Sequence, residues 1–265
     1  MLSNPAAYLR DLISYWRGGF GWRKAAAAIN AYEHYEVTVA DVPVHFMRKP
    51  GRGPIPIPLI LTHGRPWTTQ LLQRRPRLGL CPQPSLPDEQ PARARTIELD
   101  HRWAPHLAVH MFDGATLAHG LSDSPAGLPA WLLERWNSWS DNGGDVESVF
   151  TKDDLLTHAT IYWATNSIAT SMRYHANANR YPWTPAHDHT PVVQAPVGLT
   201  FVTYENPPGV GTAGERVRAF KTGPLAGWFN HINVNAHERG GHFVPWENPE
   251  AWGSNLRRTF HGHRP

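Results

Sequence analysis

A histidine behind two glycines is the strongest candidate for chemistry in this chain. His242 follows Gly240 and Gly241 in the segment Arg-Gly-Gly-His-Phe. Glycine adopts positive-φ conformations that other residues avoid, so the pair predicts a sharp turn that presents the imidazole. Imidazole titrates near neutral pH and therefore suits general acid–base chemistry. From its position alone, the residue is equally compatible with a loop histidine that bonds to backbone.

Two regular elements should hold this turn in place. Before it, three apolar residues alternate with asparagines, as in a half-exposed strand: Ile232, Val234 and Ala236. After it, Asn248 and Pro249 are typical of a helix start. The helix that follows has an apolar residue at every fourth position: Trp252, Leu256 and Phe260. We therefore expect His242 on a tight loop between the C-terminal end of a strand and the last helix, where α/β folds place catalytic side chains.

The overall composition is that of a globular protein. Hydrophobic residues make up 41% of the 265 and charged residues 18%, which excludes an extensively disordered chain. The net charge is +3, with sixteen histidines, and the basic residues form no concentrated stripe, so no nucleic-acid partner is expected. Cys81 is the single cysteine, which excludes an internal disulfide and fits a reducing compartment. Neither a long apolar run nor a signal-peptide pattern occurs, so we expect a cytoplasmic protein without a membrane span.

Pairs of histidines do not amount to a metal site in the sequence. His187 and His189 flank Asp188, and His106 and His110 are four residues apart. Neither pair has a third or fourth ligand at a recognisable spacing, which a structural zinc site requires. We therefore expect no metal and no other cofactor.

The N-terminal part predicts two helices and a hairpin. Residues 5–16 carry apolar side chains at helical spacing, and Ala25–Ala28 continue into a second short helix. Glu36–Ala40 and Val42–Met47 alternate in polarity around a turn at Asp41, as the strands of a β-hairpin do. This part therefore resembles a packed N-terminal arm.

Further along the chain, apolar runs alternate with helix signals. Leu59–Thr62 and Val197–Tyr204 are continuous apolar runs that predict strands, the first of them buried on both faces. Between them, Ser124 is expected to cap one helix, and Thr151 to open a second helix that continues as far as Tyr174. Twelve tryptophans, many of them in this helical part, indicate either an aromatic-lined apolar pocket or packing residues.

Several motifs resemble one family in combination. Arg-Gly-Gly-His-Phe followed by Glu-x-Pro is similar to the histidine loop of the epoxide hydrolases of the microsomal-type branch, within the α/β-hydrolase superfamily. The opening Tyr-Leu-Arg-x-Leu…Tyr-Trp-Arg, the His-Gly-x-Pro turn after Leu59–Thr62 and the Asp-Ser-Pro-x-Gly segment at Asp123 resemble the same family. The resemblance implies fold class α/β: an α/β-hydrolase-like, truncated parallel sheet with a helical lid.

The same resemblance divides the chain into parts. Residues 1–50 are expected to form the N-terminal meander of the epoxide hydrolases, and residues 106–189 the helical lid. Residues 51–69 and 190–265 are expected to be what remains of the hydrolase core. Residues 70–105 are rich in proline and arginine and have the composition of an irregular segment.

The resemblance also implies a catalytic pair. In the family an aspartate opens the epoxide, and a histidine at the place of His242 activates the water that hydrolyses the resulting ester. Glu205, at the end of Val197–Tyr204, matches the acid that orients this histidine and stabilises its imidazolium form. Glu215 is the rival, although its helical surroundings favour a surface role. His237 precedes the turn and is expected to be structural.

The groups that handle the epoxide oxygen depart from the family pattern. The oxyanion turn, whose backbone N–H groups face the developing charge, matches His63, Gly64, Arg65 and Pro66, with Arg65 where the family has tryptophan. Two lid tyrosines donate protons in the family, and His106 occupies the place of the first. At the second, His175 is in register and Tyr174 lies one residue early. Tyr174 is the candidate acid, with simple packing as its alternative role.

The family's nucleophile has no counterpart in the sequence. No Gly-x-Asp-x-Gly or Gly-x-Ser-x-Gly occurs anywhere in the chain, and Asp145, after Gly143-Gly144, is expected to be a turn residue. Residues 71–95 contain five prolines and five arginines, and no Val, Ile, Thr, Phe, Tyr or Trp. They lie where two further βα units belong, and one βαβ unit needs at least ~30 residues. A deletion or a shifted reading frame would explain this segment, and the gene sequence tests that hypothesis.

The expected function is that of an epoxide hydrolase family protein that is inactive or severely impaired. In the family the partner is an apolar small-molecule epoxide. Two alternatives stay open: a hydrolase that uses His242 and Glu205 as a general base on water, and a non-catalytic protein that binds an apolar ligand or a partner. A truncated sheet leaves edges and apolar faces uncovered, so self-association is a further expectation.

Overall fold

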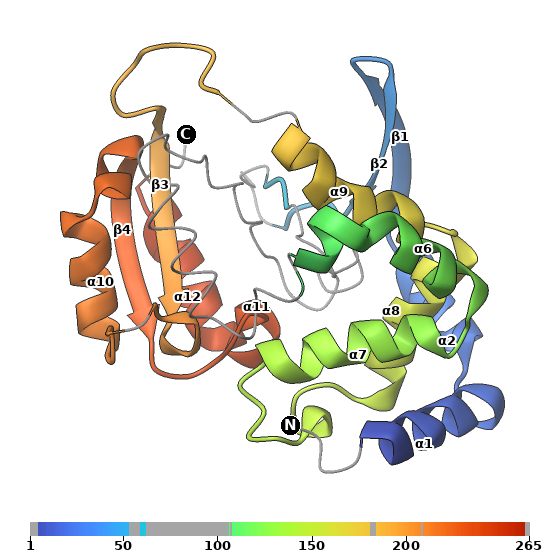
Figure 1. The fold of residues 1–265 in the computed structure, drawn as a ribbon. Helices are drawn as coiled ribbons and strands as arrows, with labels where there is room; N and C mark the ends of the chain where they lie inside the picture. The colour runs from blue at the N-terminus through green and yellow to red at the C-terminus, as the bar shows by residue number, and fades with distance from the viewer. Residues whose placement is uncertain are drawn as a thin grey trace.

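Two small sheets and a layer of helices make up the part of the chain that the structure describes. The computed structural model describes residues 5–52, 59–61, 106, 108–180, 184–207 and 209–262. Strands β1 (Glu33–Val39) and β2 (Val42–Arg48) form an antiparallel hairpin, and β3 (Val193–Val202) and β4 (Phe229–His237) form a parallel pair. Figure 1 shows the parallel pair at the left of the molecule and the hairpin at the right.

The parallel pair packs against one helix on each face, because alternate side chains of a strand point to opposite faces. Phe201 of β3 contacts Phe220 of α10 (Ala213–Thr222), with ring centroids 5.5 Å apart. The neighbouring Thr200 accepts a hydrogen bond from Asn255 of α12 (Pro249–Phe260). Since β3 and β4 are parallel and Val202 pairs with His237, the carboxyl ends of the two strands lie at one edge of the sheet. The segments that follow the two strands therefore start close together.

The helical layer holds most of the buried core. Its helices are α1 (Pro5–Gly18), α2 (Trp22–Asn30), α6 (Gly114–Asp123), α7 (Gly127–Trp139), α8 (Lys152–Ala164) and α9 (Ile168–Arg180). The chain also has shorter helical segments: the π-helix η2 (Val109–Asp113), the 3₁₀ helices η3 (Val146–Ser148), η4 (Thr203–Glu205) and η5 (Pro224–Trp228), and the single α-helical turn α11 (Val244–Glu247). Phe243 joins the buried cluster of this layer, so the residue after His242 anchors the histidine loop in the helical core. Of the helices described, none has the length and apolarity to cross a bilayer.

Local signals predicted several helix starts correctly. The Thr151 hydroxyl accepts from the backbone N–H of Asp154, whose carboxylate accepts from the backbone N–H of Thr151, a complete capping box at α8. Ser124 Oγ accepts from Gly127 N at 2.9 Å, but the N-cap of α7 is Ala126, two residues after the predicted cap. The prediction of one helix from Thr151 to Tyr174 was wrong. Asn166 adopts a left-handed φ of 49°, which asparagine tolerates better than most residues, and the chain turns there between α8 and α9.

Two predicted strands also need correction. Leu59–Leu61, the described part of the expected strand Leu59–Thr62, lie in no strand, and Ile60 is 83% exposed. A strand buried on both faces needs neighbours, and the two sheets described are built from other segments. The strand predicted to run to Tyr204 ends at Val202, and the next three residues form the turn η4.

The predicted hairpin is confirmed, and one of its faces is apolar and exposed. Ala40 and Asp41 have φ values of 47° and 63° and make the two-residue turn. Six apolar residues on one face are each more than two-fifths exposed: Tyr35, Val37, Val39, Val42, Val44 and Phe46. The register pairs Tyr35 with Phe46, so these side chains form a continuous stripe. An isolated two-stranded hairpin is marginal in water, so this stripe is a point of weakness.

Candidate active site

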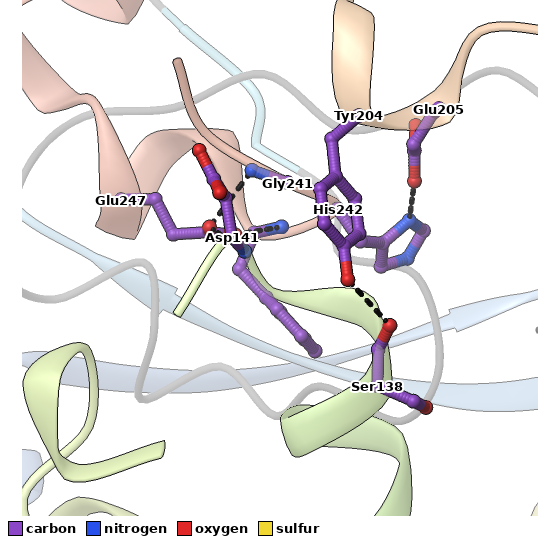
Figure 2. A network of polar contacts seen from close by, with 8 residues as sticks. Ser138, Asp141, Tyr204, Glu205, Gly241, His242 and Glu247 are labelled. Atoms are coloured by element: carbon purple, nitrogen blue, oxygen red, sulfur yellow. Dashed lines mark hydrogen bonds and ion pairs between the residues drawn. The ribbon is translucent and has the colours of Figure 1, made fainter. Parts of the chain in front are cut away.

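His242 and Glu205 meet where the two parallel strands end. His242 lies on the loop between β4 and α11, and Glu205 closes the turn η4 after β3. Nδ1 of the imidazole is 2.7 Å from Oε1 of the carboxylate, with side chains 16% and 32% exposed respectively (Figure 2). A neutral ring that donates from Nδ1 carries its lone pair on Nε2. The pair therefore has the arrangement of a general base whose orientation a carboxylate fixes.

Backbone and ring contacts fix the imidazole against the end of α7. The His242 backbone N–H donates to the Trp139 carbonyl oxygen at 2.8 Å. The indole ring of Trp139 meets the imidazole edge-on, with centroids 5.2 Å apart, and the ring of Phe243 does so at 5.4 Å. Trp139 and Phe243 are both buried. The imidazole thus lies against two buried aromatic rings and is hydrogen-bonded to the Glu205 carboxylate at Nδ1.

The two glycines of the loop have different roles. Gly240 has φ of 102°, the conformation that its prediction required. Gly241 instead lies against the end of α7. A Cβ there would be 2.5 Å from the Trp139 carbonyl oxygen and 2.8 Å from the backbone nitrogen of Asp141. Only a residue without a side chain allows the loop to approach α7 so closely.

Glu247 binds the same junction with its carboxylate. Oε2 accepts from Asp141 N at 2.7 Å and from Gly241 N at 2.8 Å (Figure 2). Oε1 accepts from Phe243 N at 2.9 Å. Burial raises the pKa of Glu247, while these backbone N–H groups act in the opposite direction and the negative charge of Asp141 adds to the rise. Asp141 itself accepts from Gly240 N at 3.1 Å. The loop is therefore tied to residues 139–141 by backbone and carboxylate bonds together.

The residue before Glu205 anchors the turn η4, and the charge of Glu205 acts on a nearby cation. Tyr204 donates its hydroxyl to the Ser138 carbonyl oxygen at 2.9 Å (Figure 2). The guanidinium of Arg216 lies 4.2 Å from the ring centroid of Phe201. Burial lowers the pKa of Arg216, and the charge of Glu205 opposes that fall. The site therefore combines one acid, one imidazole and one partly buried cation.

The other acid and the other histidine of this region have different partners. The Glu215 carboxylate accepts from Gly211 N at 2.8 Å and from Thr212 N at 3.0 Å, in the capping box of α10. These bonds lower the pKa of Glu215. Nε2 of His237 lies 2.7 Å from Nδ2 of Asn255, and burial lowers the pKa of this histidine. The structure thus brings Glu205, rather than Glu215, to His242, and it places His237 against α12.

Tyr174, the candidate proton donor, is exposed, whereas His106, at the place of the family's first lid tyrosine, is buried. His106 is 3% exposed, and its ring lies 4.8 Å from that of Trp139, which also contacts His242. Tyr174 lies on α9 and is 64% exposed. The residues predicted for the oxyanion turn, His63, Gly64, Arg65 and Pro66, lie outside the described residues, as do residues 70–105 and the side chain of His175.

The lid tryptophans serve mainly in packing. Trp136 and Trp139 are buried in the helical core, and Trp131 packs against it. A cavity of about 700 Å³ lies between α1, α2 and α8, lined by aromatic and charged residues that include Tyr15, Lys24 and Asp154. Neither His242 nor Glu205 lines that cavity. Asp145 accepts from Glu147 N at the start of η3, which confirms it as a turn residue.

Three residues of the site were missed by sequence reasoning: Trp139, Asp141 and Glu247. Glu247 stands in the Glu-x-Pro segment beside the histidine loop, and that proximity was the available signal. Its bond to Asp141 joins residues 106 positions apart, and no short-range pattern reports such a contact. Trp139 ends a tryptophan-rich helix whose period indicates burial but not which loop packs against it.

Comparisons with known proteins show which proteins this chain is similar to. Residues 4–70 match the family model described as epoxide hydrolase N terminus. Epoxide hydrolase 1 of Oryctolagus cuniculus is 23% identical over 362 aligned residues, which cover 92% of this chain and 77% of that protein. The alignment is longer than the present 265 residues, so the rabbit protein has segments without a counterpart here.

Solved structures give the same fold. Juvenile hormone epoxide hydrolase of the silkworm Bombyx mori superimposes with a TM-score of 0.69 at 20% identity, covering 96% of this chain and 82% of that one. The epoxide hydrolase of Aspergillus niger superimposes with a TM-score of 0.68 at 16% identity, covering 96% and 84%. The α/β-hydrolase fold class is thus confirmed. The chain is a relative of the epoxide hydrolases, with their N-terminal segment and their α/β-hydrolase fold.

Proposed function

We propose that this chain carries the water-activating half of an epoxide hydrolase site and lacks the half that forms the covalent intermediate. The observation that carries the proposal is the 2.7 Å contact between His242 Nδ1 and Glu205 Oε1 at the carboxyl ends of β3 and β4. In this arrangement Nε2 removes a proton from water, and Glu205 stabilises the imidazolium that forms. The substrate class is an apolar epoxide, because Trp139 and Phe243 surround the imidazole.

The missing half is the nucleophile. Covalent catalysis splits epoxide opening into attack by a carboxylate and hydrolysis of the ester. The sequence has no nucleophile-elbow motif, and the gaps in the alignment with the rabbit protein are consistent with a lost segment. Two further carboxylates lie beside the histidine loop, but Asp141 and Glu247 both accept bonds from backbone N–H groups. Neither is oriented toward a bound substrate by these contacts.

The expected consequence is a protein without detectable epoxide hydrolysis. Loss of the nucleophile from a comparable triad costs on the order of 10⁶ in kcat. The test is diol formation from styrene oxide, measured for the purified chain and for His242→Asn. We expect both to equal the uncatalysed rate. Diol formation by the native chain that His242→Asn abolishes would contradict the proposal of an inactive site.

One second function is favoured by the same contact. With the pair already assembled, His242 could act directly as a general base on water that attacks the epoxide, without an ester. The two routes differ in the source of the oxygen during one turnover with enzyme in excess, in ¹⁸O-labelled water. Direct attack puts label into the diol at once, whereas the covalent route first delivers an unlabelled oxygen from the enzyme carboxylate. A labelled diol that requires both His242 and Glu205 would establish this second function.

A non-catalytic binding role has less support. Its motivation was an aromatic pocket in the lid, and Trp136 and Trp139 are instead packed in the core. Self-association has a more specific basis, because the apolar face of the β1–β2 hairpin is exposed in the described part of the chain. We propose that this face, rather than the lid, is where copies of the chain associate at high concentration.

A further inference from the structure

Glu247 holds the histidine loop on both sides of His242 at once. Its carboxylate accepts from Gly241 N at 2.8 Å and from Phe243 N at 2.9 Å, the residues immediately before and after the histidine. It also accepts from Asp141 N at 2.7 Å, two residues beyond the C-terminal end of α7. We propose that Glu247 is a positioning residue, whose carboxylate sets the distance between the His242 imidazole and Glu205.

The contacts to α7 show why this side chain does more than end a short helix. A bond from Glu247 to Phe243 alone would be an ordinary contact within α11. The bond to Asp141 adds a donor 106 positions away in the sequence. The same stretch of α7 provides the Trp139 carbonyl that accepts the His242 N–H. Glu247 thus joins the loop to the element that also supports the imidazole ring.

A carboxylate is the group that this arrangement requires. Three backbone N–H groups converge on Glu247, and an ionised carboxylate offers only acceptors. The nearly isosteric glutamine has one carbonyl oxygen and an NH₂ group. In either orientation its NH₂ would face at least one N–H donor, so the three bonds could not all persist. Glu247→Gln therefore removes the interaction while it keeps the volume.

The position of the imidazole depends on this support, because Gly241 and Phe243 fix the backbone of His242 from both sides. When their N–H groups lose Glu247, the loop keeps the His242 N–H bond to Trp139 and the Gly240 N–H bond to Asp141, but the residues on either side of His242 are no longer held. We expect the Nδ1–H bond to Glu205 to lengthen or break. This inference rests on the proposed role of the His242–Glu205 pair, yet its test does not require turnover.

The experiment is NMR on the full chain with four variants. The readouts are the low-field signal of the His242 Nδ1–H and the exchange rates of the backbone amides of Asp141, Gly241 and Phe243. His242→Asn and Glu205→Gln identify the signal. Glu247→Gln tests the positioning role, and Glu250→Gln is the matched control, since Glu250 is an exposed carboxylate three residues away. Thermal unfolding of each variant shows whether the fold persists.

The expected result is specific to one variant. Glu247→Gln should lose or shift the Nδ1–H signal, and its three amides should exchange at least about tenfold faster than in the native chain. Glu250→Gln should resemble the native chain in both respects. An unchanged signal in a folded Glu247→Gln protein would overturn the positioning role while leaving the His242–Glu205 pair intact. If Glu205→Gln left the low-field signal of the native chain unchanged, the His242–Glu205 pair itself would be overturned. The positioning role of Glu247 would then be overturned with it.

If Glu247→Gln does not fold, hydrogen exchange in the native chain decides the question. The amides of Asp141, Gly241 and Phe243 should then open together, at a single rate and in one pH dependence, because one carboxylate holds all three. Independent opening of these amides would contradict the proposal.

Discussion

Gly241→Ala should destabilise the protein through a contact that no surrounding side chain can relieve. The new Cβ would lie 2.5 Å from the Trp139 carbonyl oxygen, 2.8 Å from Asp141 N and 2.9 Å from Ser140 Cα. All three atoms belong to the backbone, so the loop or the end of α7 must move. That movement also breaks the 2.8 Å bond from His242 N to the Trp139 carbonyl.

The magnitude follows from the two effects. Overpacking costs about 1–3 kcal/mol and the lost hydrogen bond about 1 kcal/mol, so the free energy of unfolding should fall by about 2–4 kcal/mol. For a protein of this size that corresponds to a decrease of roughly 5–15 °C in Tm. Urea unfolding followed by tryptophan fluorescence measures the change.

A second glycine provides the matched control. Gly253 lies inside α12, where an added Cβ would be 3.6 Å from the flexible Arg257 guanidinium. Because glycine weakens a helix interior, Gly253→Ala should stabilise the protein by about 0.5–1 kcal/mol. The reasoning would be refuted if Gly241→Ala and Gly253→Ala changed the free energy of unfolding in the same direction and by similar amounts.

Three further predictions concern the core, the alkaline limit and the exposed hairpin. Leu132→Ala, at a fully buried position of α7, should lower the free energy of unfolding by about 2–5 kcal/mol in urea titration, and a change below about 1 kcal/mol would contradict the assigned core. Burial, and then the charge of Glu147, raises the pKa of Tyr8, so the folded state keeps this proton where the unfolded chain loses it, near pH 10. The stabilisation from Tyr8 should therefore be complete below about pH 10 and decrease as the pH rises above that value. In Tyr8→Phe, the urea midpoint should fall less between about pH 8 and about pH 11 than in the native chain. An equal fall in both proteins would exclude Tyr8 as its source. Replacing Val37 and Val44, an exposed cross-strand pair, by threonine should reduce the fluorescence of a dye that binds apolar surface. The same change should reduce self-association in sedimentation. Unchanged values would show that the surface responsible for self-association lies elsewhere.

Elements with strong local signals were predictable from the sequence. The histidine turn follows from its two glycines, and α12 from Asn248 and Pro249, because these effects act within a few residues. The hairpin turn at Asp41 follows from the change in polarity pattern on either side. In each case the physics that fixes the structure is contained in a short stretch of chain.

Elements that depend on distant partners were not predictable. Leu59–Thr62 has the composition of a buried strand, but a strand also needs neighbours, and composition does not report them. The break between α8 and α9 depends on the φ of 49° at Asn166, a conformation that asparagine tolerates but that its presence in a helical stretch does not require. The bond from Asp141 N to Glu247 and the bond from His242 N to the Trp139 carbonyl join segments about 100 positions apart, so only the three-dimensional structure reveals them.

The mass of the intact protein after mixing with styrene oxide tests the central proposal most directly. A covalent epoxide hydrolase would gain the mass of one substrate on a carboxylate, and His242→Asn would make that ester accumulate, because hydrolysis of the ester requires the base. The absence of a nucleophile predicts an unchanged mass for both the native chain and His242→Asn. One added substrate in His242→Asn, mapped by peptide analysis to an aspartate or glutamate, would contradict the account and identify the nucleophile.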